Sequence, residues 1–159
     1  MPEDARLGVS QDAAIVLALA ETAVPFASSQ EDEAERWVRL LRLHGQVGGA
    51  LQALGVGEAP LETIAVEPSA RPAPMSQRSR RLVVTKVAGA AGRFASGRGA
   101  RAIATVDILF AIFQIYGGTF DRALYARGTS REELIERLAA DAELLGRRAG
   151  EPMGSTQPA

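Results

Sequence analysis

Apolar residues recur along this chain with the period of an α-helix, and this pattern restricts the fold to an all-α class. Trp37, Leu40, Leu41 and His44, for example, follow the i, i+3, i+4, i+7 spacing of one helix face. No segment has the convincing apolar–polar alternation of a strand. Alanine, the residue with the highest helix propensity, is abundant throughout. We therefore expect a protein that is helical nearly throughout.

The expected helices cover about 9–24, 30–44, 47–54 and 60–66, then 78–94, 105–116, a short segment before Gly128, and a last segment ending near 145. The first begins at a Ser10 cap, the second at Ser29, and the last at a capping box over 129–132. The segment 105–116 is apolar nearly all round, which predicts the central buried helix. Three prolines mark 67–76 as a linker, and 146–159 is expected to be a disordered tail.

The amino-acid composition excludes several kinds of chemistry. The chain has no cysteine, one histidine and one lysine, Lys86, with no glycine in the residues just before it. Thiolate catalysis, cysteine or multi-histidine metal sites and a P-loop are therefore excluded. The longest apolar run, 13–20, is too short to cross a membrane, and the first residues lack the basic region of a signal peptide. We expect a cytoplasmic protein with no enzymatic activity and no cofactor.

Charge is unevenly distributed along the chain. Residues 1–67 carry 11 acids and 4 bases, residues 68–106 carry 8 bases and no acid, and residues 107–159 carry 8 acids and 6 bases. Such a basic block (71–101) can bind nucleic acid or another acidic partner, or it can attract the acidic half of the same fold. The near-zero total charge and the low aromatic content disfavour nucleic acid.

The two halves of the sequence resemble each other at an offset that we take as a constant 73 residues. At this offset, Asp32 corresponds to Thr105 and Trp37 to Phe110. The positions that match directly are Gly45 and Gly118, Ala50 and Ala123, Leu51 and Leu124, Ala53 and Ala126, Gly55 and Gly128, and Leu61 and Leu134. The pattern predicts two four-helix units, one at about 9–66 and one at about 77–145, packed as one domain over 1–145.

A repeat of this length, with Leu51-Gln52-Ala53-Leu54-Gly55-Val56 closing its first copy, resembles the double Clp-N repeat. That repeat forms the N-terminal domain of Clp-type AAA+ unfoldases. The resemblance implies two pseudo-twofold-related four-helix repeats in a non-catalytic domain that docks substrates and adaptors. Without an ATPase, such a chain would be an accessory or modulator of protein quality control. Its partners would be unfolded or tagged polypeptides, or a Clp-type ATPase or protease subunit. We do not expect it to bind a membrane.

The resemblance also suggests binding residues. In certain family members an acid after a helix-opening threonine helps to hold an arginine-phosphate group. The sequence has Asp32 and Glu33 at this place in the first copy, whereas Val106 follows Thr105 in the second, and Ser76 approximates the hydroxyl that opens the second unit. The uneven charge distribution further predicts a groove between the two units. Glu31 to Glu35 would form its acidic wall, and the arginines at 78, 80 and 81 its basic wall. The candidate partner-binding residues are Asp32, Glu33, Ser76, Arg78, Arg80, Arg81 and Thr105.

These groups also have structural interpretations. Acids at 31–35 complement the dipole at the start of a helix, and His44 complements the end of the same helix. The aromatic side chains could line a peptide groove, but a stripe at helical spacing is more typical of a core. The aromatic residues in question are Trp37, Phe110, Phe113 and Tyr116.

Overall fold

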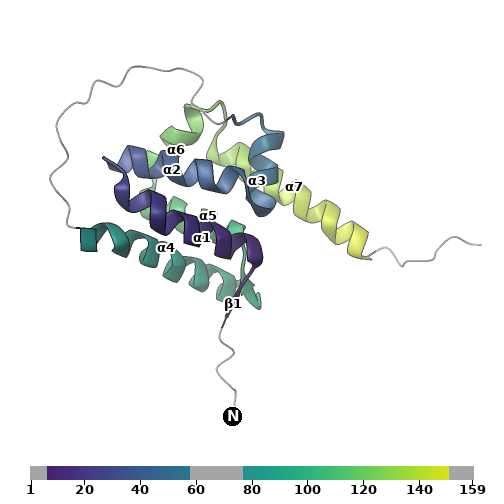
Figure 1. Ribbon diagram of the computed structural model, residues 1–159. Helices are drawn as coiled ribbons and strands as arrows, with labels where there is room; N and C mark the ends of the chain where they lie inside the picture. Colours follow the sequence, from purple (N-terminus) through teal and green to yellow (C-terminus); the bar gives the residue numbers. More distant parts are fainter. Residues whose placement is uncertain (1–6, 58–76, 151–159) are drawn as a thin grey trace, which may run out of the picture.

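The protein, seen in a computed structural model, is built almost entirely from helices (Figure 1). The structure describes the backbone of residues 7–57 and 77–150 and the side chains of 7–57 and 82–143. In chain order the helices are α1 (Gln11–Ala23), the 3₁₀ turn η1 (Val24–Phe26), α2 (Gln30–Arg42), α3 (Gly45–Ala53), α4 (Gln77–Gly97), α5 (Thr105–Tyr116), α6 (Gly118–Tyr125) and α7 (Arg131–Gly150). The expected all-α class is confirmed. The predicted helix at 60–66 and linker at 67–76 lie outside the described residues.

Two short strands, β1 (Gly8–Val9) and β2 (Ala102–Ile103), form a parallel pair that the sequence did not predict. Two residues are too few to show the alternation by which a strand is recognised. The backbone N–H of Gly8 donates to the carbonyl of Arg101 at 3.0 Å, and that of Ser10 donates to the carbonyl of Ile103 at 2.9 Å. The pair therefore joins the segment before α1 to the segment before α5.

Serine side chains cap three helix starts, and two of these caps, Ser10 and Ser29, were predicted. Ser10 and Ser29 accept hydrogen bonds from the backbone N–H three residues later, at 3.2 and 3.1 Å. At the start of α7 the capping residue is Ser130 rather than Thr129, since Ser130 Oγ accepts from the backbone N–H of Glu133 at 3.2 Å. Each of these bonds satisfies one of the N–H groups that a helix start leaves without a partner.

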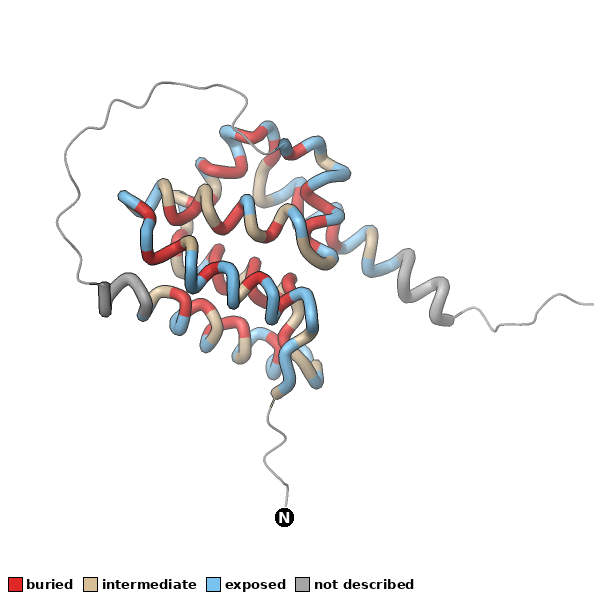
Figure 2. Tube along the Cα trace, viewed as in Figure 1, coloured by how far each residue is buried: buried red, intermediate tan, exposed pale blue. Residues whose placement is uncertain are grey.

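Helix α5 is the centre of the fold, as predicted. It packs against α4, α3, α6, α1 and α2. Its buried residues lie on nearly every side of the helix and are Thr105, Asp107, Ile108, Leu109, Ala111, Ile112, Phe113 and Tyr116. In the surrounding helices, by contrast, exposed positions alternate with the buried ones (Figure 2).

Helix α7 differs from its prediction. Among its described side chains Leu134 and Leu138 are buried, whereas the apolar Ile135, Ala139 and Ala142 are exposed. The helix packs against α3, and Arg131 in its first turn pairs with Asp121 of α6, whereas the rest of the helix extends away from the other helices (Figure 1). It continues to Gly150 instead of ending near 145, since no proline interrupts this stretch.

Buried positions recur between the two halves, at offsets that change from helix to helix. In α1 and η1 they are Ala13, Val16, Ala20 and Val24, and 71 positions later they are Val84, Val87, Ala91 and Ala95 of α4. In α2 they are Glu33, Ala34, Trp37, Val38 and Leu41, and 75 positions later they are Ile108, Leu109, Ile112, Phe113 and Tyr116 of α5. The predicted constant offset of 73 is therefore wrong for these helices. The cause is unequal spacing, because α2 begins 15 residues before α3 whereas α5 begins 13 before α6.

The offset of 73 does hold for α3 and α6. Each of these helices is followed within three residues by a glycine with positive φ, +81° at Gly55 and +84° at Gly128. The same hydrogen bond follows each glycine, from Val56 N–H to the Leu51 carbonyl and from Thr129 N–H to the Leu124 carbonyl. This is the Schellman pattern, in which a left-handed residue lets the chain turn back onto the last helical turn.

Candidate functional site

The first predicted binding residue, Asp32, forms hydrogen bonds within its own chain at the start of α2. Its Oδ2 accepts from the backbone N–H of Ser28 at 2.9 Å and from Arg36 Nη2 at 3.3 Å. Partial burial acts to raise the pKa of Asp32, but the hydrogen bonds from Ser28 and Arg36 outweigh it and hold this pKa below the ordinary value of 3.8. Arg36 in turn donates to the carbonyl of Ala23 at 2.9 Å, which fixes the end of α1 against α2.

The other acids of the predicted wall also have partners or positions within the same chain. Glu35 forms an ion pair with Arg127, whose side chain is fully buried. Glu31 lies 3.8 Å from Arg122 of α6, and both of these side chains are exposed. Glu33 is 8% exposed, because it lies on the face of α2 that packs into the core. The run 31–35 therefore does not form an open acidic wall.

Thr105 is likewise inaccessible to a surface ligand. It is 3% exposed and lies against the start of α3, where a Cβ added to Gly45 would be 2.6 Å from Thr105 Oγ1. By its place in the helix cap, the residue of α5 that corresponds to Asp32 is Asp107, since both occupy the third helical position. The proposed equivalence of Asp32 and Thr105 is therefore wrong.

Asp107 has the most buried carboxylate among the ion pairs of the described residues, and its partner Arg98 is 46% exposed. The Asp107 side chain is 1% exposed and accepts from Arg98 Nε at 2.8 Å and from Arg98 Nη2 at 2.6 Å. It also accepts from the backbone N–H of Ala104 at 2.8 Å. The bidentate hydrogen bond to Asp107 raises the pKa of Arg98. Arg98, a member of the basic block, is therefore engaged within the fold.

A small polar cluster lies inside the helical core. Trp37 Nε1 donates to the hydroxyl of Tyr116 at 3.0 Å, joining α2 to α5. Burial, and then the nearby charge of Glu33, raise the pKa of Tyr116 well above its ordinary value. Of the aromatic residues considered for a groove, Trp37, Tyr116 and Phe113 are buried and Phe110 is partly buried. The core interpretation of this stripe is therefore the better one.

The remaining predicted residues belong to the second half. Ser76 and the side chains of Arg78, Arg80 and Arg81 lie outside the described residues. The backbone of these arginines forms the first turns of α4, which packs against η1 at the end of the molecule where α2 also begins (Figure 1). Farther along α4, Lys86 and Arg93 are exposed, and within the described range no carboxylate pairs with either.

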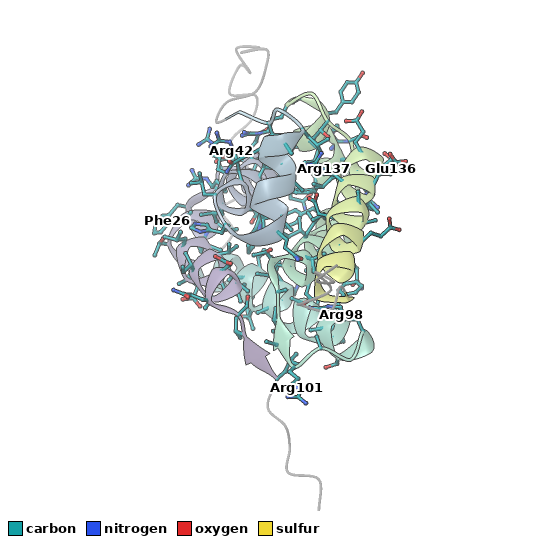
Figure 3. The ribbon with its side chains drawn as sticks, turned by 90° about the vertical axis from the view of Figure 1, so that its right-hand side faces the viewer. Phe26, Arg42, Arg98, Arg101, Glu136 and Arg137 are labelled. Carbon is teal, nitrogen blue, oxygen red and sulfur yellow. The ribbon has the colours of Figure 1, made fainter. Side chains whose placement is uncertain are left out.

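An exposed apolar surface on α1 and η1 was not predicted. Ile15 and Leu19, one helical turn apart, are 36% and 42% exposed, and Phe26 of η1, about two turns farther, is 66% exposed. Phe26 lies at the outer edge of the molecule (Figure 3), and Leu82 of the adjacent α4 is 50% exposed. We call Ile15, Leu19, Phe26 and Leu82 the α1–α4 face. In the sequence, the part of this face on α1 could have been recognised from the run 13–20. All residues of this run are apolar, but only one side of α1 is buried, so the apolar residues on its other side are exposed.

Other kinds of site have no counterpart among the residues described. Within residues 7–57 and 82–143 no group of three histidine, aspartate or glutamate side chains could hold a metal ion. None of the helices in the described part combines the length and the apolar character needed to cross a membrane. A scan against protein-family models and a search of curated proteins both found no match to this chain.

Proposed function

We propose that this chain is a non-enzymatic protein-binding module of the cytoplasm, similar to the docking domain of Clp-type unfoldases. In this proposal it binds unfolded polypeptides, or presents them to a Clp-type ATPase, as an accessory subunit in protein quality control. The proposal combines the sequence resemblance at Leu51 to Val56 with the packing of the described helices. The binding surface that we assign to it is the α1–α4 face.

Reciprocal packing supports the two-unit arrangement. Helix α2 of the first half packs against α6 of the second, and α5 of the second half packs against α3 of the first. A twofold relation between two units requires such exchanged contacts. The recurring buried positions and the shared caps of α3 and α6 support the same arrangement.

The observation that carries the proposed function is the exposed apolar side of α1. Helices that are apolar all round are ordinarily buried, and α1 has apolar side chains on its outer side as well. Ile15 and Leu19 lie one turn apart on the same side of α1, so its exposed apolar surface is more than one scattered residue. Clustered surfaces of this kind mark sites at which another polypeptide binds.

The test is a pair of matched surface variants, Phe26→Ser and Tyr125→Ser. Phe26 and Tyr125 are both strongly exposed aromatic residues, 66% and 80%, but Tyr125 ends α6, outside the α1–α4 face. Binding of reduced, carboxymethylated lactalbumin and of a Clp-type ATPase is measured by fluorescence anisotropy. We expect Phe26→Ser to weaken binding by about tenfold and Tyr125→Ser to leave it unchanged. Equal effects of the two variants, or no binding by the wild type, would contradict the proposal.

The basic block offers a second candidate, a regulatory protein that binds an acidic partner or nucleic acid through residues 71–101. One observation favours it: Lys86 and Arg93 are exposed on α4, a helix without any acidic residue. Binding to a DNA duplex that weakens steeply with salt, and that Lys86→Glu and Arg93→Glu both reduce, would favour this second function.

A further inference from the structure

The basic block, residues 71–101, is largely unpaired within the described part of the fold. Three acids of the run 31–35 pair with arginines, but none of these arginines belongs to the block. Of the block's four described bases, only Arg98 forms an ion pair, with Asp107 of α5. The other three are exposed and have no ion pair among the described residues; they are Lys86, Arg93 and Arg101. Attraction between the two halves of the fold therefore does not account for the block.

Helix α4, at one edge of the molecule, carries two of these bases on its outward side (Figure 1). Lys86, Gly89 and Arg93 are all exposed and are spaced i, i+3 and i+7, so they lie along one stripe of the helix. Leu82, one turn before Lys86, lies on the same stripe and is 50% exposed. We call Leu82, Lys86, Gly89 and Arg93 the α4 stripe. It faces away from the fully buried positions of the helix, which are Val87, Ala91 and Ala95.

The position between the two cations of the α4 stripe has no side chain. A Cβ added to Gly89 would have one neighbour within 4 Å outside the local backbone, Nη1 of Arg93 at 3.9 Å. The guanidinium of Arg93 therefore lies back along the helix, beside the turn that contains Gly89. Lys86 is three residues before Gly89, and side chains at this spacing are neighbours on a helix surface. One carboxylate placed over Gly89 is therefore within reach of both cations.

We propose that the α4 stripe binds an acidic polypeptide, with a carboxylate of the partner over Gly89, between Lys86 and Arg93. Charge complementarity indicates the acid, because neither cation has an ion pair in the described part of the chain. Leu82 indicates the polypeptide. A phosphate backbone is contacted by charged and polar groups, to which an exposed leucine adds nothing, whereas a polypeptide supplies carboxylates and apolar side chains together.

This inference rests on the second candidate function and narrows it to one helix and one class of partner. It does not depend on Ile15, Leu19 or Phe26, which support the first. Exposed ion pairs are individually weak, so we expect an affinity in the micromolar range. Binding should weaken between about 0.05 and 0.5 M salt, because exposed charges are screened.

The first experiment compares Gly89→Glu with Gly49→Glu. Both glycines are exposed positions inside helices, so the two variants have the same net charge, and glutamate favours a helix more than glycine does. Only the change at Gly89 places an acid three residues after Lys86 and four before Arg93, where it pairs with these cations and occupies the site. Fluorescence anisotropy measures the binding of a fluorescein-labelled peptide of Glu-Leu-Glu-Ala repeats.

We expect the wild type and Gly49→Glu to bind this peptide alike, and Gly89→Glu to bind it about tenfold or more weakly. Gly89→Gln adds a side chain of the same size without charge and should retain most of the binding. Circular dichroism checks that each variant is folded. Equal effects of Gly89→Glu and Gly49→Glu, or no binding of the peptide by the wild type, would overturn the inference.

Two further probes test the class of partner. A peptide of Gln-Leu-Gln-Ala repeats should bind about tenfold or more weakly than the acidic peptide, because it has no carboxylate to place over Gly89. A DNA duplex should also bind more weakly than the acidic peptide at the same salt concentration. A duplex that binds more tightly, with the same loss in Gly89→Glu, would overturn the inference and leave the second candidate function standing. If neither the acidic peptide nor the duplex binds, both are wrong.

Discussion

The helix starts of α2 and α5 use the same capping chemistry in different surroundings. At each start an aspartate in the third helical position accepts a backbone N–H from just before the helix and pairs with an arginine. Asp32 is about one-third exposed, and its Arg36 lies on the same helix, four residues later. Asp107 is 1% exposed, and its Arg98 comes from the turn that follows α4. One pair is local, and the other joins two helices.

The two ion pairs should therefore contribute differently to stability, since one only caps a helix and the other also holds two helices together. Exposed i, i+4 pairs contribute a few tenths of a kcal/mol, because water competes for both charges. A carboxylate removed from water depends on its partner, since losing the partner leaves a buried charge uncompensated. We therefore expect the α5 start to matter much more for stability than the α2 start.

The largest effect is expected for Arg98→Met. This variant keeps much of the side-chain length but leaves Asp107 without its bidentate partner, so we expect a loss of about 2–4 kcal/mol in the free energy of unfolding. Urea denaturation followed by circular dichroism measures it. A loss below about 0.5 kcal/mol would show that Asp107 is stabilised without Arg98, and the comparison would fail.

An intermediate effect is expected for Asp32→Ala. The variant removes the acceptor for Ser28 N–H and the partner of Arg36, and cap removals of this kind cost about 1 kcal/mol. The same denaturation assay applies, with Glu136→Ala, an exposed acid inside α7 without a described ion pair, as the control. A loss as large as that of Arg98→Met would remove the proposed distinction between the two helix starts.

The smallest effect concerns acid stability. The pKa of Asp32 is lower in the folded chain than in the unfolded one, so its stabilisation is present above the unfolded pKa of 3.8 and is lost as pH falls through the folded value. Asp32→Asn removes this titration. Between about pH 5 and pH 2, the variant should therefore lose slightly less stability than the wild type, as followed by thermal denaturation. An identical or steeper loss in the variant would contradict this sign.

Local structure was largely predictable from the sequence because its causes are local. The helical period, the caps at Ser10 and Ser29 and the central position of α5 all depend on residues within a few positions of one another. The offset between the two halves was not fully predictable from the sequence. Direct residue matches such as Gly55 and Gly128 determine the offset for α3 and α6 only. The other pairs align through burial, which depends on the packed neighbours.

The candidate site was predicted less well, for the same reason. A run of acids at 31–35 looks like an open surface, but Glu35 finds its arginine 92 residues later and Glu31 pairs with Arg122. Pairing over such distances leaves no periodic trace in a single sequence. The α1–α4 face had a local signal in the apolar run 13–20, but a sequence alone does not tell which side of a helix stays uncovered.

Arg127 also has a consequence for when the chain can fold. It donates to the carbonyl of Gly57 and to Glu35, which precede it by 70 and 92 residues, and α2 needs α6 just as α3 needs α5 and α7. During synthesis the first half therefore leaves the ribosome with apolar faces whose partners do not yet exist. The contacts of α2 with α6, and those of Glu35 and Gly57 with Arg127, become available only when the segment carrying Arg127 has emerged, so the first half stays incompletely packed until then.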